Sequence, residues 1–261
     1  MKNPIRLRRS KPRPDDEGDM TLIGHLSELR TRLIRSVLAI VVGALVVYIF
    51  FDPIFDFLAG PYCDLKISQG EECEFLTTTP LEGFSVVLSL SGYGGLILAL
   101  PVILYQLGKF VLPGLYPNER KVLMPFFAVS VVLLALGMVG GYLLMPKTLS
   151  VLTGFGSDTF VELFSPRAYT GFFVKMLLAF GVAAELPLVL VFLQLVGVVT
   201  TDTLRKNRRI AIVAVAVLSA LVTPTGDPFT LAVLAIPMYL FFEIALIIGG
   251  RMTKRRQLVL D

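Results

Sequence analysis

Residues 84–107, FSVVLSLSGYGGLILALPVILYQL, decide the fold class of this chain, because they form a long apolar run without a charged side chain. About 20 apolar residues are enough for an α-helix to cross the hydrocarbon core of a bilayer. The composition agrees: 55% of the 261 residues are hydrophobic and 17% are charged, whereas soluble domains carry roughly 25% charged residues. The sequence therefore predicts an all-α membrane protein with several spanning helices.

Five further apolar runs flank this one, and each is expected to span the membrane. They cover residues 33–51, 122–145, 169–196, 210–223 and 229–248. Proline lacks a backbone N–H, so we expect helices to kink at Pro101, Pro187 and Pro237 and the third span to end at Pro146. The last two spans are expected to be short and to form an antiparallel hairpin, since only residues 224–228 separate them.

The Lys and Arg residues indicate the orientation of the chain in the membrane. Twenty of the 24 lie in residues 1–35, 108–121, 197–209 and 249–261, and only three lie in the alternate loops 52–82, 146–168 and 224–228. Because cytoplasmic loops are enriched in Lys and Arg, we expect six spans with both termini in the cytoplasm. The net charge of +4 then reflects orientation rather than binding of nucleic acid.

Three regions follow from this pattern. Residues 1–19 mix basic and acidic side chains with prolines and show no periodicity, which is typical of a disordered tail. Residues 20–250 are expected to form the membrane domain, and residues 251–261 a basic cytoplasmic tail.

The cysteine and histidine content restricts the chemistry of the chain. Cys63 and Cys73 both lie in the loop 52–82, and either a disulfide across the nine intervening residues or two free thiols fit their spacing. His25 is the single histidine, so we expect no metal site and no cofactor. The sequence has no HExxH motif and no nucleophile paired with a base, so an enzyme is not expected.

An amphipathic helix is predicted before the first span. Its leucines, which recur at helical spacing, are Leu22, Leu26, Leu29 and Leu33. Glu28 and Arg32 stand four residues apart on this helix. They form either a local salt bridge or, in the functional interpretation, Glu28 is an exposed acid for a basic ligand.

The loop after residues 84–107 is expected to be stiff and to form a recognition surface. Pro113 and Pro117 restrict its backbone. Glu119 matches the first turn of a helix that begins at Asn118. That match does not account for Phe110, which lies nearby on the water side of the span.

Two further acids stand at unusual positions. Glu185 lies deep in the run 169–196, and carboxylates within a membrane usually face a cavity, a partner or a proton path. Asp227 lies in the turn TPTGDP between the last two spans, where it is expected to cap the following helix.

Five groups of motifs follow one another along about residues 20–250. In chain order they are HLSELRTRL, PVILYQ with PGLYPNER, AFGVAAELP, LRKNRR and TPTGDPFTLAVLAIPMY. In these motifs the chain resembles a known family, the TatC family. The resemblance implies a cupped scaffold of six helices that acts as the receptor and core subunit of the twin-arginine protein translocase. It implies binding of twin-arginine signal peptides at the cytoplasmic face.

The resemblance also implies partners and a location. The partners are single-span subunits like TatA and TatB, further copies of the chain within a larger complex, and membrane lipid. The complex would export folded proteins across the cytoplasmic membrane of a prokaryote, driven by the proton-motive force.

The family's functional positions carry over to particular residues. The signal-peptide contacts match Glu28, Phe110 and Glu119, and the intramembrane acid of the concave groove matches Glu185. Contact with a partner subunit is expected around Thr223 and Asp227. At Leu231 the family often has Gln, so Thr223 is what remains of the polar cluster expected near the last span.

One alternative of a different class is a proton- or ion-coupled transporter of small solutes that uses Glu185. Such transporters are typically built from repeated halves with broken helices at matching positions. No such repeat is visible in the sequence.

Overall fold

The computed structural model describes residues 22–111, 123–154, 164–223 and 227–260. Within these ranges the regular structure is helical and contains no strand. The helices are α1 (Leu22–Ile49), α2 (Phe51–Ser68), α3 (Glu82–Val111), α5 (Leu123–Thr153), α6 (Pro166–Ala184), α7 (Leu186–Val196), α8 (Thr201–Lys206), α9 (Arg208–Val222) and α10 (Pro228–Leu260). The predicted all-α class is therefore confirmed, while the tail 1–19 lies outside the described residues.

Five segments in the described part of the chain are long and apolar enough to cross a membrane. They are Gly24–Ile49, Glu82–Phe110, Pro125–Thr153, Pro166–Gln194 and Pro228–Met252. Large apolar side chains remain exposed along them, for example Leu33 at 62% and Leu143 at 70%. Such exposure along spanning helices is what contact with lipid requires.

Two predictions about helix ends were wrong, and one about a proline was confirmed. Pro146 does not end the third span, because α5 continues through it to Thr153; spanning helices tolerate proline where neighbouring groups satisfy the freed carbonyl. The interruption expected at Pro187 is present: the run 169–196 is two helices divided at Glu185, with Pro187 in the first turn of α7, where its missing N–H is not needed. The last helix, α10, has 33 residues and is not short, whereas α9 has 15.

Two helical features lie outside the predicted spans. The amphipathic segment around Glu28 and the first span form one continuous helix, α1. The loop 52–82 contains α2, an 18-residue helix that includes Pro61. Its helical character was missed because its acids and prolines interrupt the apolar pattern, and its Leu58, Ala59 and Tyr62 become buried only against other helices.

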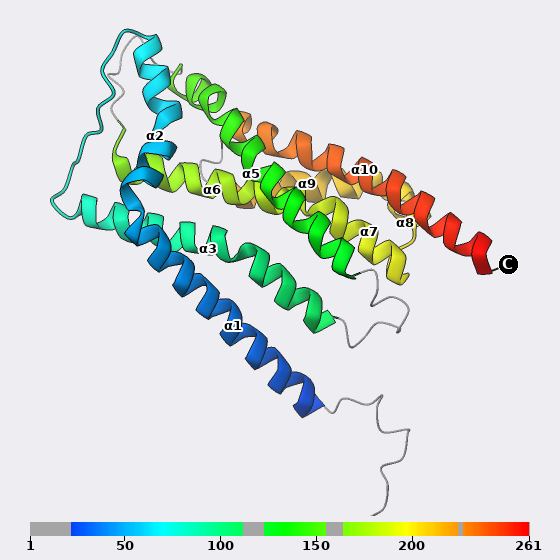
Figure 1. The fold of residues 1–261 in the computed structure, drawn as a ribbon. Helices are drawn as coiled ribbons and strands as arrows, with labels where there is room; N and C mark the ends of the chain where they lie inside the picture. Colours follow the sequence, from blue (N-terminus) through cyan, green and yellow to red (C-terminus); the bar gives the residue numbers. More distant parts are fainter. Residues whose placement is uncertain (1–21, 112–122, 155–163, 224–226, 261) are drawn as a thin grey trace, which may run out of the picture.

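The spanning helices lie side by side in pairs (Figure 1). The helix α1 runs along α3, α5 along α6, and α7 along α10, while α9 returns against α10 as the predicted hairpin. Glycine permits two of these approaches. A Cβ atom on Gly95 would lie 2.4 Å from the backbone nitrogen of Ala44, and one on Gly137 would lie 2.5 Å from the carbonyl oxygen of Phe180.

An aromatic core joins α2 to α6 at the end of the molecule that lies opposite the beginning of α1 (Figure 1). Tyr169 donates a hydrogen bond of 2.7 Å to the Leu58 carbonyl, and Tyr62 donates one of 3.1 Å to the Glu74 carbonyl. Cys63 and Cys73 are joined by a disulfide with their Cα atoms 4.9 Å apart, which ties the segment after α2 to this core.

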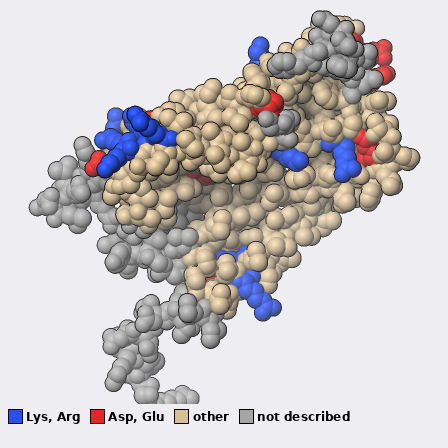
Figure 2. Space-filling model, turned by 180° about the vertical axis from the view of Figure 1, so that it is seen from behind, with Lys and Arg blue, Asp and Glu red and all other residues tan. Residues whose placement is uncertain are grey.

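Seen from behind, the surface is hollowed between the part formed by α1 and α3 and the part formed by α9 and α10 (Figure 2). Blue Lys and Arg side chains gather near the beginning of α1 and where α8 ends and α9 begins (Figure 2). The described residues thus form a cupped bundle with basic groups at the ends of several helices.

Candidate functional site: the end of α1 and α3

The first part of the site is an ionic cluster between α1 and α3. Arg32 Nη2 donates to Glu28 Oε1 at 2.5 Å and Arg32 Nε to the same oxygen at 3.2 Å. Arg32 Nη1 also donates to Gln106 Oε1, 3.2 Å away on α3. The side chains of Arg32 and Glu28 are 18% and 20% exposed. The predicted local salt bridge is therefore present, and it extends to a second helix.

Phe110 lies in the last turn of α3, where its ring stacks on His25 with centroids 4.4 Å apart. His25 precedes Glu28 by three residues, so it lies one turn away on the same side of α1. Packing of α1 against α3 therefore brings an aromatic ring and a carboxylate to the same end of the two helices. Lys109 directly precedes Phe110, and its ammonium lies 4.3 Å from the centre of the Tyr105 ring, about one turn earlier on α3.

The two predicted acids in the rest of the chain have different surroundings. Glu119 lies outside the described residues. Glu185 is 7% exposed, at the break between α6 and α7, and its Oε2 accepts a hydrogen bond of 2.9 Å from Ser130 on α5. No described group bonds to Glu185 Oε1. In the single chain this carboxylate is thus enclosed by helices.

Thr223 and Asp227 flank the turn between α9 and α10. Asp227 Oδ1 accepts a hydrogen bond of 2.7 Å from the backbone N–H of Thr230, which confirms the predicted cap of α10. Thr223 is 7% exposed. The Thr230 hydroxyl is fully buried and has no hydrogen-bond partner among the described residues. The hairpin between α9 and α10 therefore contains buried threonine side chains in addition to the Asp227 cap.

Two buried polar residues were not anticipated. Gln106 anchors Arg32, and Gln194 on α7 donates to the Ala245 carbonyl of α10 at 3.3 Å while accepting from Thr201 at 2.8 Å. Both lie in apolar runs, where a glutamine gives no signal of its partner. Their roles depend on which helices are neighbours.

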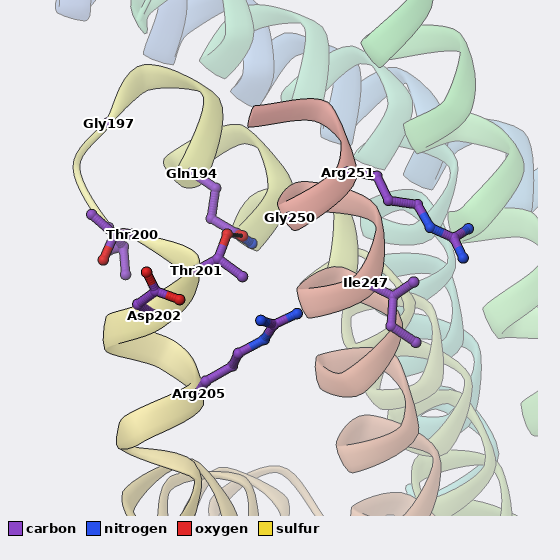
Figure 3. Close-up of a pocket in the computed structure, with 10 residues that line it drawn as sticks. Gln194, Gly197, Thr200, Thr201, Asp202, Arg205, Ile247, Gly250 and Arg251 are labelled. Atoms are coloured by element: carbon purple, nitrogen blue, oxygen red, sulfur yellow. Dashed lines mark hydrogen bonds between the residues drawn. The ribbon is translucent and has the colours of Figure 1, made fainter. Parts of the chain in front are cut away.

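A pocket of about 620 Å³ lies beside Gln194, between the α7–α8 connection and α10 (Figure 3). Thr201 points toward Gln194 in this view, and the Arg205 side chain extends toward α10, whereas the Arg251 side chain points away from Arg205. The pocket has a mixed lining, with the apolar Val199 and Ile247 beside the charged Asp202, Arg205 and Arg251. Among the described residues no cluster of His, Cys, Asp and Glu suited to a metal ion is present.

Together, the long apolar helices and their exposed apolar side chains define a polytopic α-helical membrane protein. Residues 24–237 match the family model described as Sec-independent protein translocase protein (TatC). A TatC protein of Frankia casuarinae is 39% identical over 247 residues, covering 92% of this chain and 68% of the relative. One of Aquifex aeolicus is 34% identical, covering 91% and 98%.

A solved structure has the same fold. The crystal structure titled Twin Arginine Translocase Receptor TatC superposes with a TM-score of 0.77 at 35% identity, covering 88% of this chain and 99% of that one. The chain belongs to the TatC family. Membership favours the translocase interpretation over the solute transporter.

Proposed function

We propose that this chain is the receptor and core subunit of a twin-arginine translocase, and that it binds twin-arginine signal peptides where α1 and α3 end together. The observation that carries the proposal is the placement of the Glu28 carboxylate one helical turn from the His25–Phe110 stack. A carboxylate and an aromatic ring suit a peptide that presents arginines followed by an apolar segment.

Arginine supplies the recognition chemistry. A guanidinium presents a fork of N–H donors that matches a carboxylate, and charge-assisted hydrogen bonds contribute roughly 1.5–3 kcal/mol each. Micromolar affinity requires about 8 kcal/mol. Two arginines paired with Glu28 and Glu119 fall short of this once ordering costs are included, so we infer that the apolar part of the peptide packs against Phe110.

The topology that we propose has six spans, with both termini in the cytoplasm of a prokaryotic cell. In this arrangement α9 is the fifth span. Its 15 residues extend about 22 Å at 1.5 Å per residue, less than the ~30 Å hydrocarbon core. Local thinning of the bilayer or cover by a partner would accommodate it. The basic ends of α1, α3, α9 and α10 then face the cytoplasm, as the positive-inside rule requires.

The proposed complex contains single-span subunits like TatA and TatB and further copies of this chain. It would export folded proteins by means of the proton-motive force. We place the partner contacts at the hairpin residues Thr223 and Asp227 and assign Glu185 to the intramembrane groove, because polar groups within a spanning region usually face a cavity or another polar helix.

Site-specific photocrosslinking tests the proposal directly. A photoreactive phenylalanine analogue at Phe110, in the full chain in native membranes, should crosslink a twin-arginine peptide and give much less product with a twin-lysine peptide. Phe57 is the matched control, since it is an aromatic on α2 that is 60% exposed and lies far from this site. Equal crosslinking from the two positions, or equal crosslinking of the two peptides, would argue against a signal-peptide site at Phe110.

A further inference from the structure

The Glu28 carboxylate already holds a guanidinium. Arg32 of the same helix contacts Glu28 Oε1 through two nitrogens, at 2.5 and 3.2 Å. No described group bonds to Glu28 Oε2. When an arginine ligand approaches Glu28, Arg32 already neutralises the negative charge of the carboxylate and occupies its Oε1 atom.

Arg32 is also held from the other side. Its Nη1 bonds to Gln106 Oε1 at 3.2 Å, and Gln106 is 9% exposed within α3. A guanidinium anchored on two helices loses less conformational freedom on pairing than a free surface arginine does. The internal ion pair is thus better organised than an ordinary contact at i, i+4 spacing.

We propose that Arg32 is an intramolecular competitor of a ligand arginine. By pairing with Glu28, Arg32 sets the affinity of the site for the ligand. This inference rests on the proposed function. The guanidinium of the ligand takes the place of Arg32 on Glu28 Oε1. The displaced Arg32 keeps its hydrogen bond to Gln106, so that its charged group retains a polar partner. No covalent bond changes, and the carboxylate exchanges one guanidinium for another.

The competition has a simple thermodynamic form. When only a fraction of the protein has a free Glu28, the apparent Kd equals the intrinsic Kd divided by that fraction. Arg32 therefore raises the apparent Kd of every ligand that needs Glu28 by the same factor. The ratio of the Kd values for lysine and arginine peptides therefore stays unchanged, although both Kd values are raised.

Arg32→Gln in the full-length protein, reconstituted in nanodiscs, tests this inference. We expect the Kd of a synthetic twin-arginine signal peptide to fall about two- to five-fold, the range expected for an ion pair at a partly exposed site. The Kd of the twin-lysine peptide should fall by the same factor. Arg30→Gln is the matched control, because it removes one positive charge from an exposed residue that pairs with no described group.

A double-variant cycle identifies the route of the effect. In a Glu28→Gln background, Arg32→Gln should no longer tighten binding, since no carboxylate remains to be freed. If Arg32→Gln lowers the melting temperature too far for binding measurements, Arg32→Lys replaces it. Its single ammonium holds Glu28 less well than the fork, so its Kd should lie between those of wild type and Arg32→Gln.

The outcomes distinguish a failure of the proposed competition from a failure of the proposed function. A Kd for Arg32→Gln that equals or exceeds that of Arg30→Gln, or a tightening that persists without Glu28, overturns the competition. Wild-type protein that binds the twin-arginine and twin-lysine peptides equally would overturn the proposed function itself, and the competition with it.

Discussion

The hydroxyl of Ser130 on α5 donates a hydrogen bond of 2.9 Å to Glu185 Oε2 at the break between α6 and α7. The break and the acid coincide, and Ser130 is itself 5% exposed. Buried polar groups without a partner are costly. This one contact therefore stabilises the carboxylate at the break between the two helices.

Replacement of Ser130 by Ala should lower stability. It leaves Glu185 Oε2 buried without a donor, which costs about 1–3 kcal/mol. Thermal unfolding of the purified protein in detergent measures the effect. Ser91→Ala is the control, because the Ser91 hydroxyl is equally buried yet has no partner among the described residues, so its removal should be close to neutral. Equal losses in the two variants would show that packing, not the hydrogen bond, is what matters.

Replacement of Gly95 by Ala should separate α1 from α3. The added Cβ would lie 2.4 Å from the Ala44 nitrogen, so the helices must move, at a cost of about 1–3 kcal/mol for an overpacked contact. Gly92→Ala on the same helix meets nothing within 4 Å and should leave stability unchanged or raise it slightly. Because the site needs both helices, Gly95→Ala should also weaken peptide binding. A Gly95→Ala protein as stable as Gly92→Ala would contradict the close approach.

Removal of the disulfide should destabilise the end of the molecule around α2. Cys63→Ser with Cys73→Ser opens the loop between two positions that are ten apart in sequence, and the lost constraint is worth about 2–3 kcal/mol. Melting temperatures of the double variant and of the reduced wild type should fall together. We expect the peptide affinity to stay the same, since α2 and the site lie at opposite ends of α1 (Figure 1). A wild-type protein unaffected by reductant would exclude a stabilising role for the bridge.

The charge of Glu28 should matter more than its length. Glu28→Gln removes the ionic partner of an arginine, whereas Glu28→Asp keeps the charge on a side chain shorter by one methylene. The loss of affinity for a twin-arginine peptide should therefore be larger for Gln, by about ten-fold if one charge-assisted bond is replaced by a neutral one. Binding isotherms for both variants decide this. If Asp is the worse substitution, reach and not charge governs the contact.

The sequence by itself determined those features that depend on neighbours along the chain. The apolar runs predicted the spanning helices because each must satisfy its backbone hydrogen bonds internally within a bilayer. The turn TPTGDP predicted the Asp227 cap because the acceptor and the Thr230 N–H are three residues apart. Glu28 and Arg32 paired as predicted for the same reason, four residues apart on one helix.

Only the tertiary structure decided which distant groups meet. Gln106 is 74 residues from Arg32, and Ser130 is 55 residues from Glu185. The helix α2 and the break at Glu185 also depend on packing, because α2 buries Tyr62 against α6 and the break brings a carboxylate to α5. The local sequence pattern does not predict such pairings, since an apolar helix can pack against many different neighbours. Close contacts, such as that of Gly95 with Ala44, select one of them.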